Sequence, residues 1–228
     1  GTPNFSFQQE DFMQNEMIDI GERTVPRFAD LNNDGLQDLV VSNGKYQPKG
    51  SASVHTYYYY ENTGTATLPA FTLVDTNFMD ISNYGMGDGS IPTFADLDND
   101  GDLDALVGDR TGLIHYFTNS SSTSPNFSLA AAGIGSIDVG NSAAPFLYDI
   151  DSNGTYDLFI GNEKGTIYYY SNSSSTSPAF SLEDNKLGSI DIGGANSYGH
   201  SIPYIFKENG VNNLLVGSLH YGIFQYNS

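Results

Sequence analysis

A short acidic loop occurs three times in this chain, with oxygen-bearing side chains at the same positions. Positions 1, 3, 5 and 9 of each copy are Asp or Asn, and position 6 is Gly35, Gly101 or Gly154. Carboxylate, amide and backbone carbonyl oxygens are the ligands that Ca²⁺ prefers, and glycine permits the sharp turn between them. The sequence therefore predicts three Ca²⁺ sites, in which the position-7 residue contributes its carbonyl. The predicted ligands are Asp30, Asn32, Asp34, Leu36 and Asp38; Asp96, Asp98, Asp100, Asp102 and Asp104; and Asp149, Asp151, Asn153, Thr155 and Asp157.

An EF-hand begins with the same pattern but requires a bidentate Glu at position 12 and two flanking helices. Here position 12 is Val41, Val107 or Ile160. Each loop is followed by a short apolar run that ends at turn-forming residues, which is typical of a buried strand. The loops are therefore expected to join two strands. Acidic surface turns without a metal are the alternative, and three copies at identical spacing disfavour it.

The elements around the loops form a repeat whose loop glycines, with Gly210 in a degenerate fourth copy, recur at intervals of 66, 53 and 56 residues. Such periods are typical of propellers and solenoids. Each unit contains a Pro-containing strand before the loop, an apolar strand, an aromatic strand and a Pro-Ala-Phe or Pro-Asn-Phe strand. The predicted fold is an all-β propeller with four-stranded antiparallel blades. We expect one domain over residues 1–228, with repeats at about 21–82, 83–139, 140–192, and 193–228 plus 1–20.

The last repeat ends after its third strand, whereas the chain opens with a fourth-strand pattern, Pro3-Asn-Phe5-Ser-Phe7. Pairing of this N-terminal strand with the last blade would close a four-bladed ring and cover its open edge. A part of a larger propeller is the alternative. In the fourth copy the loop carboxylates are replaced by Ile205, Lys207, Asn209 and Asn213, so no calcium is expected there.

The run from Pro92 to Asp104, Pro-Thr-Phe-Ala-Asp-Leu-Asp-Asn-Asp-Gly-Asp-Leu-Asp, resembles the FG-GAP and VCBS repeats of integrin-like propellers. The resemblance extends over nearly the whole chain. It implies Ca²⁺ bound between the first and second strands of a blade, at the Asp and Asn positions named above. It does not fix an activity, because such repeats occur in adhesins, lectins, receptor ectodomains and polysaccharide lyases.

Composition restricts the classes of partner. The net charge is −19 with only 8 Lys and Arg, which disfavours nucleic acid and anionic membranes. No apolar run reaches the 18 residues of a membrane span, so no membrane insertion is expected. Cysteine is absent, which excludes a disulfide framework and leaves calcium as the expected stabilising device of a secreted or cell-surface protein. The chain is also compatible with one part of a larger multidomain protein.

A ligand is expected on the face opposite the calcium loops, where connections between blades gather. The first repeat carries an insertion there, Lys45 to Ser53, and aromatic and charged residues flank the other blade connections. These groups suit a glycan or protein ligand. The candidate ligand-binding residues are Arg23, Lys45, Tyr46, Lys49, Tyr84, Asp88, Tyr198 and His200.

The sequence favours a non-catalytic recognition or adhesion module. The alternative is a polysaccharide lyase domain, in which a neutral His and a Tyr would act as base and acid. The chain offers four His and 16 Tyr, but no spacing singles out such a pair. A serine nucleophile elbow is not present in the sequence either.

Overall fold

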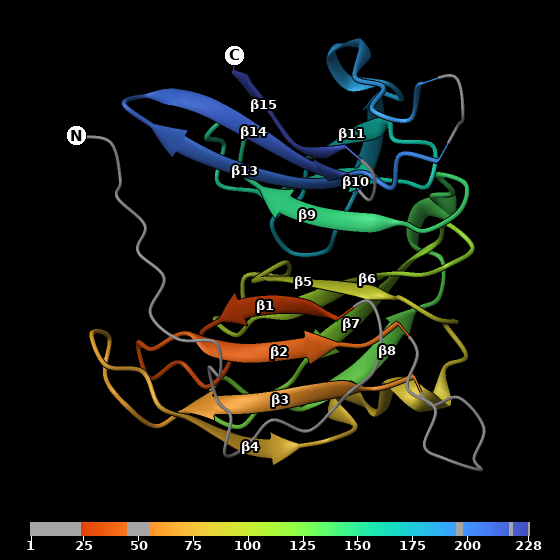
Figure 1. Cartoon of the computed structure of the whole chain (residues 1–228). Coiled ribbons are helices and arrows are strands. Elements are labelled where there is room, and N and C mark those ends of the chain that lie inside the picture. Colours follow the sequence, from red (N-terminus) through yellow and green to blue (C-terminus); the bar gives the residue numbers. More distant parts are fainter. Residues whose placement is uncertain (1–23, 45–54, 195–197, 219–220, 228) are drawn as a thin grey trace.

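The computed structural model describes residues 24–44, 55–194, 198–218 and 221–227, which form four antiparallel sheets (Figure 1). Each sheet is a meander whose strands pair in chain order. The first three sheets have four strands and the fourth has three among the described residues. The strands are β1 (Val25–Ala29), β2 (Asp38–Ser42), β3 (Tyr57–Asn62) and β4 (Phe71–Asp75); β5 (Ile91–Ala95), β6 (Asp104–Gly108), β7 (Ile114–Asn119) and β8 (Phe127–Ala131); β9 (Ala144–Tyr148), β10 (Asp157–Gly161), β11 (Ile167–Asn172) and β12 (Phe180–Asp184); and β13 (Ile202–Glu208), β14 (Val211–Ser218) and β15 (Gly222–Asn227).

The four sheets are arranged as the blades of a four-bladed β-propeller, and the predicted all-β fold class is confirmed. The first strands of neighbouring blades lie next to one another, with β5 between β1 and β9, and β9 beside β13. Figure 1 shows blades 1 and 2 in one half of the molecule and blades 3 and 4 in the other. The strands of each blade fall within the corresponding predicted repeat.

Short 3-10 segments lie in the connections from one blade to the next: η1 (Phe78–Asn83), η2 (Ile134–Ser136) and η3 (Leu187–Ser189). No helix in the described ranges is long and apolar enough to cross a membrane.

The second strand of each complete blade is an apolar run because neighbouring sheets cover both of its faces. All residues of β6 and β10 are buried. Each of these two strands ends at a glycine where the chain entering the next blade passes very close. A Cβ atom at Gly108 would lie 2.3 Å from the Ala143 carbonyl oxygen, and one at Gly161 would lie 2.0 Å from that of Ser201. The glycines thus permit the close approach of adjacent blades.

The apolar core lies in the seams between blades. In the seam of blades 1 and 2, Tyr59 of β3 stacks on Phe78 of η1 with ring centroids 4.7 Å apart. Phe78 also meets Phe127 of β8 edge to face at 5.4 Å, and Phe127 packs near Phe94 of β5. An aromatic residue of the outer strand therefore fills the seam between its own blade and the preceding one.

The seam of blades 3 and 4 contains a cavity of about 410 Å³ where the corresponding aromatic residue would lie. Its lining includes Tyr169, Leu187 and Ile205, which occupy the places that Tyr59, Phe78 and Phe94 have in the first seam. The expected N-terminal strand, residues 1–20, lies outside the described residues, so closure of the ring stays a prediction. The cavity is apolar and has the position that Phe5 would fill.

We expect Phe5→Ala to lower the free energy of unfolding by roughly 3–5 kcal/mol, as truncation of a buried Phe does elsewhere. The measurement is urea unfolding followed by circular dichroism. Phe127→Ala is the matched control because Phe127 occupies the equivalent position in the seam between blades 1 and 2. If the Phe5→Ala variant and the wild type have the same urea midpoint of unfolding, closure of the ring by this strand is contradicted.

Candidate functional site

The three acidic loops connect the first and second strands of blades 1, 2 and 3, and they lie on the same face of the propeller. Each loop begins after β1, β5 or β9 and ends at the Asp that opens β2, β6 or β10. Position 6 requires glycine, since φ is +86° at Gly35, +94° at Gly101 and +86° at Gly154. The predicted strand-loop-strand setting is therefore present in all three copies.

Hydrogen bonds to backbone amides fold each loop around its own side-chain oxygens. In the third loop the Asp149 carboxylate accepts from the amides of Asn153 and Gly154, both at 3.1 Å. Asn153 Oδ1 accepts from the Thr155 amide at 2.7 Å. The second loop has the same pattern, with Gly101 N donating to Asp96 at 3.2 Å and Asp102 N to Asp100 at 3.1 Å. These turns direct the oxygens of positions 1, 3 and 5 toward one point.

The carboxylates of the second and third loops converge closely enough to hold one ion. Asp96, Asp98 and Asp100 offer oxygens that all lie within 4.8 Å of one another, and so do Asp149, Asp151 and Asp157. The first loop has Asn32 at position 3, and this amide donates to the Asp34 carboxylate at 3.1 Å. The donor set in all three loops consists of hard oxygens, which fits Ca²⁺.

Position 9 has a second role that the sequence did not reveal. Asp38, Asp104 and Asp157 are completely buried, and each carboxylate accepts hydrogen bonds from two backbone amides. Asp104 Oδ1 accepts from the Asn119 amide at 2.9 Å, and Asp104 Oδ2 accepts from the Leu97 amide at 3.3 Å and the Tyr116 hydroxyl at 3.0 Å. Position 9 thus connects the start of the loop to the end of the third strand in the same blade.

The partner residue at the end of each third strand is also a functional element that was missed. Asn62, Asn119 and Asn172 are buried. Each backbone amide donates to the position-9 carboxylate, and each side-chain oxygen accepts amides of the turn toward the fourth strand. The signal in the sequence was an Asn at the same place in three repeats, directly before the Ser- and Thr-rich turn.

In the second loop, burial and neighbouring negative charges make the ionised form of several carboxylates unfavourable when no cation is bound. Burial raises the pKa of Asp102 to about 6, and the charges of Asp100 and Asp98 add to the shift. Burial likewise raises the pKa of Asp104 to about 6, against the opposing effect of its hydrogen bonds. Burial and the Asp100 charge raise the pKa of Asp98 as well. A bound cation would offset this repulsion.

We expect the calcium-free protein to gain stability from protonation of Asp102 between pH 7 and pH 5. Its pKa is about 6 in the folded state and near 4 in the unfolded chain, so the stabilisation is fully present below pH 4 and is lost as the pH rises through 6. The lowered pKa of buried His55 acts in the opposite direction over this range. The measurement is therefore the melting temperature of wild type minus that of Asp102→Asn, in EDTA at each pH. A difference that becomes more negative on acidification would contradict the assignment.

The fourth blade connects its first two strands differently. Only Asn209 and Gly210 separate β13 from β14, with φ of +51° and +83°. An Asn-Gly pair with two positive φ angles is the usual two-residue hairpin turn. Lys207 lies within β13 and pairs with Asn212, so this connection has no loop of the acidic type.

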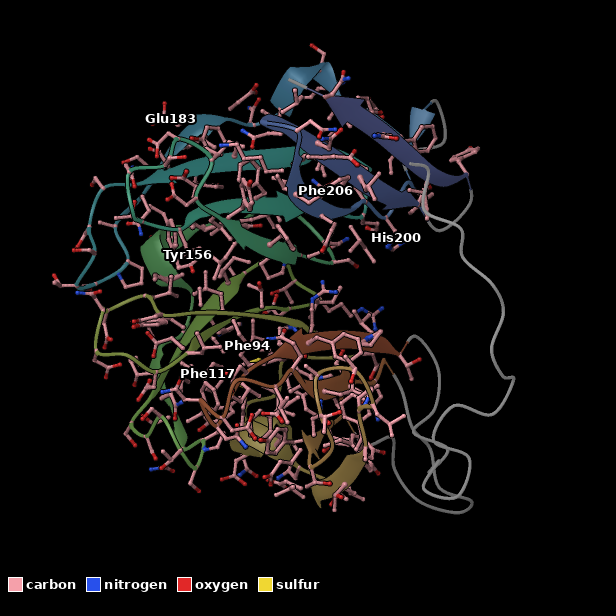
Figure 2. The ribbon with its side chains drawn as sticks, turned by 90° about the vertical axis from the view of Figure 1, so that its left-hand side faces the viewer. Phe94, Phe117, Tyr156, Glu183, His200 and Phe206 are labelled. Atoms are coloured by element: carbon pink, nitrogen blue, oxygen red, sulfur yellow. The ribbon has the colours of Figure 1, made fainter. Side chains whose placement is uncertain are left out.

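The opposite face carries a cavity of about 420 Å³ on the propeller axis, which we call the axial pocket. It is lined from the starting ends of all four first strands, and its walls combine apolar side chains with hydroxyls and two ionisable groups. Its main lining residues are Thr24, Val25, Asp88, Ile91, Ser142, Ala144, His200, Ser201, Ile202 and Ser218. In Figure 2, Tyr156 of the third loop and His200 lie on opposite sides of the molecule.

Two of the eight candidate ligand-binding residues, Asp88 and His200, line the axial pocket. Asp88 lies 3.8 Å from Arg110, and His200 lies 4.0 Å from Glu163. Tyr84 packs edge to face on Phe117 and does not line the pocket, and neither does Tyr198, which is 58% exposed. The remaining four, Arg23, Lys45, Tyr46 and Lys49, lie outside the described residues.

The histidines near third strands make structural hydrogen bonds. His55 Nε2 lies 2.6 Å from the hydroxyl of Ser90, which also contacts the completely buried Tyr57 hydroxyl. His115 Nε2 lies 2.9 Å from Asp109, and both residues are buried. Burial raises the pKa of Tyr57 and lowers that of His55. Neither pair reaches the axial pocket.

Comparison with known proteins agrees with the loop geometry. No curated protein matches the chain by sequence. The model of the FG-GAP-like repeat matches residues 30–107, which extend from the first acidic loop through most of β6. The segment that contains the first two acidic loops is therefore similar to the FG-GAP-like repeat.

Proposed function

We propose that this propeller is a non-catalytic recognition module, stabilised by calcium and working outside the cell as a secreted or surface-attached protein. In this proposal the three acidic loops bind Ca²⁺, and the axial pocket binds a glycan or protein ligand. The presence of a pocket formed by all four blades, on the face away from the loops, is the observation that carries the proposal.

The calcium part is supported by the FG-GAP-like match and by the convergence of oxygens in the loops. Positions 1, 3, 5 and 9 would supply side-chain oxygens, and the position-7 carbonyl would complete the loop's contribution. Such a loop is part of a strand connection and has its own protein ligands, so it suits a structural ion. Millimolar extracellular Ca²⁺ would occupy even weak sites.

The ligand part is supported by the composition of the axial pocket. Ile91, Ala144 and Ile202 provide apolar walls, while the hydroxyls of Thr24 and Ser142 and the ionisable groups of Asp88 and His200 provide directional contacts. A concave, largely apolar site with a few polar groups is typical of ligand pockets. Its volume suits a small group, such as one sugar ring or one or two peptide side chains.

Thr24→Trp tests this site because Thr24 is exposed at the pocket wall and the indole would occupy the cavity. Binding is measured on immobilised panels of glycans and of extracellular peptides in millimolar Ca²⁺. We expect the variant to lose at least about tenfold in affinity for the ligands that wild type captures, the effect of losing a few contacts. Thr72→Trp, on exposed outer strand β4, is the matched control and should bind as wild type.

Equal binding by the two Trp variants would move the ligand away from the axial pocket. The lyase alternative predicts a different result. Incubation with uronate-containing polysaccharides would then generate an unsaturated sugar, which is followed by its ultraviolet absorbance. Robust turnover would replace the recognition proposal with an enzymatic one.

A further inference from the structure

A second cavity lies on the loop face, between the first and second acidic loops, and we call it the seam cavity. It has a volume of about 160 Å³. The first loop contributes Asp30 and Asn33, the second contributes Asp102, and Ser122 comes from the turn before β8. Leu31 and Leu103 also line it, and both belong to or pack against the apolar cluster of blades 1 and 2. The cavity is thus at the junction of two blades.

Asp102 is out of pattern among the position-7 residues. The equivalent residues are Leu36 and Thr155, and the Thr155 hydroxyl is hydrogen-bonded to the Asn172 carbonyl at 2.7 Å. Asp102 is only 8% exposed, and its Oδ1 atom is buried without a hydrogen-bond partner. A buried carboxylate oxygen that is charged and unpaired is strongly destabilising, so it requires a counter-charge or a proton.

The surroundings of Asp102 supply further negative charge and no neutralising group. Asp100 and Asp98 belong to the same loop as Asp102, and Asp30 lines the same cavity from the first loop. The described residues that line the cavity include no Lys, Arg or His. Asp102 also belongs to a loop in which the position-7 side chain is not needed for the loop ion, because only the carbonyl serves there.

We propose that the seam cavity binds an additional divalent cation of the Ca²⁺ type, held jointly by Asp102 and Asp30 with the side-chain oxygens of Asn33 and Ser122. All four are oxygen donors, which favours Ca²⁺ over zinc or copper. The volume accommodates the ion with several waters, at about 30 Å³ per water. This ion connects two blades, whereas each loop ion acts within one blade.

The inference goes beyond the proposed function and is tested by counting bound Ca²⁺ at saturation, by equilibrium dialysis and atomic absorption. Wild type should bind one ion more than Asp102→Asn. Asp102→Thr introduces the residue of the third loop and should give the same loss if the Asn variant folds poorly. Asp149→Asn is the matched control, since it changes the third loop and leaves the seam cavity intact.

Each result has a defined meaning. Loss of one ion in both Asp102 variants supports the seam site, whether or not Asp149→Asn loses an ion. Loss in Asp149→Asn alone supports the loop sites and overturns the seam site. An unchanged count with weaker binding at one site would place Asp102 in the shell of the second loop's own ion and also overturn the proposal.

Crystals grown with Tb³⁺, a probe for Ca²⁺ sites, give an independent location. The seam site requires an anomalous peak between Asp30 and Asp102, separate from the peaks inside the loops. A water at that place, with no anomalous signal, would overturn the proposal.

Discussion

Removal of Ca²⁺ with EGTA at pH 7.5 should lower the melting temperature by about 15 °C or more relative to protein in millimolar Ca²⁺. An ion at about 100 times its dissociation constant adds about 2.7 kcal/mol to the stability of the folded state, and three sites would contribute about 8 kcal/mol. For a domain of this size each kcal/mol corresponds to about 2–4 °C. Differential scanning calorimetry measures the shift directly.

The calcium experiment has an internal control in the choice of ion. Re-addition of Ca²⁺ should restore the melting temperature, while the same concentration of Mg²⁺ should restore much less of it, because Mg²⁺ requires a small octahedral shell. A melting temperature that does not respond to EGTA would contradict calcium binding by the loops. The proposed recognition function would then lose its structural ion but not its axial pocket.

Asp104→Ala should be the most destabilising substitution in the second loop, even without calcium. It removes the acceptor of three donors, namely the amides of Leu97 and Asn119 and the hydroxyl of Tyr116. Each donor left buried and unpaired costs about 1–3 kcal/mol, so we expect a loss of roughly 3–6 kcal/mol. Part of this cost is offset because the substitution also removes a carboxylate whose ionised form is disfavoured by burial, as its raised pKa shows. Urea unfolding in EDTA measures the difference.

Asp98→Ala is the matched control because Asp98 lies in the same loop but is only partly buried, and its Oδ1 accepts a single amide, that of Asp100. We expect this variant to weaken Ca²⁺ binding while changing the calcium-free stability by less than about 1 kcal/mol. Equal destabilisation by both variants in EDTA would show that position 9 is no more structural than position 3.

The blade pattern was predictable because its signals are local. The Asp-rich loop, its glycine and the apolar run after it lie within about a dozen residues, and the same order recurs in three repeats. The outer strand was recognisable from its Pro and Phe residues at the same spacing. The three repeats within this one chain are therefore enough to identify the pattern of a blade.

The double role of position 9 was not predictable, because it depends on a residue that is distant in sequence. Asp38 and the amide of Asn62 come together only when the third strand folds back beside the second. The surroundings of Asp102 were not predictable for the same reason, because Asp102 shares a cavity with the first acidic loop, which belongs to another blade. Sequence spacing describes ligands within a loop but not contacts that the tertiary fold creates.

Of the candidate ligand-binding residues in the described ranges, Asp88 and His200 line the axial pocket and Tyr84 and Tyr198 do not, and ligand binding by any of them stays a prediction. All four lie in or beside blade connections, and the two that line the pocket come two or three residues before β13 or β5. Tyr84 lies at the end of η1, where packing on Phe117 is available. Proximity to the axis, which the sequence does not display, decides between the two groups.

The hydrogen bonds of Asp38, Asp104 and Asp157 each stay inside one blade, and this has a consequence for how the molecule would resist mechanical load. The position-9 carboxylates connect the first three strands of a blade into one unit. Adjacent blades meet through apolar side chains and through a few backbone hydrogen bonds near the chain entering the next blade, such as those from Ala143 N to the Asp109 carbonyl and from Ser201 N to the Asn162 carbonyl. The hydrogen bonds within one buried network strengthen one another, so the loss of one weakens the rest. A molecule stretched between its two ends would therefore extend in discrete steps, each step releasing one sheet as a whole.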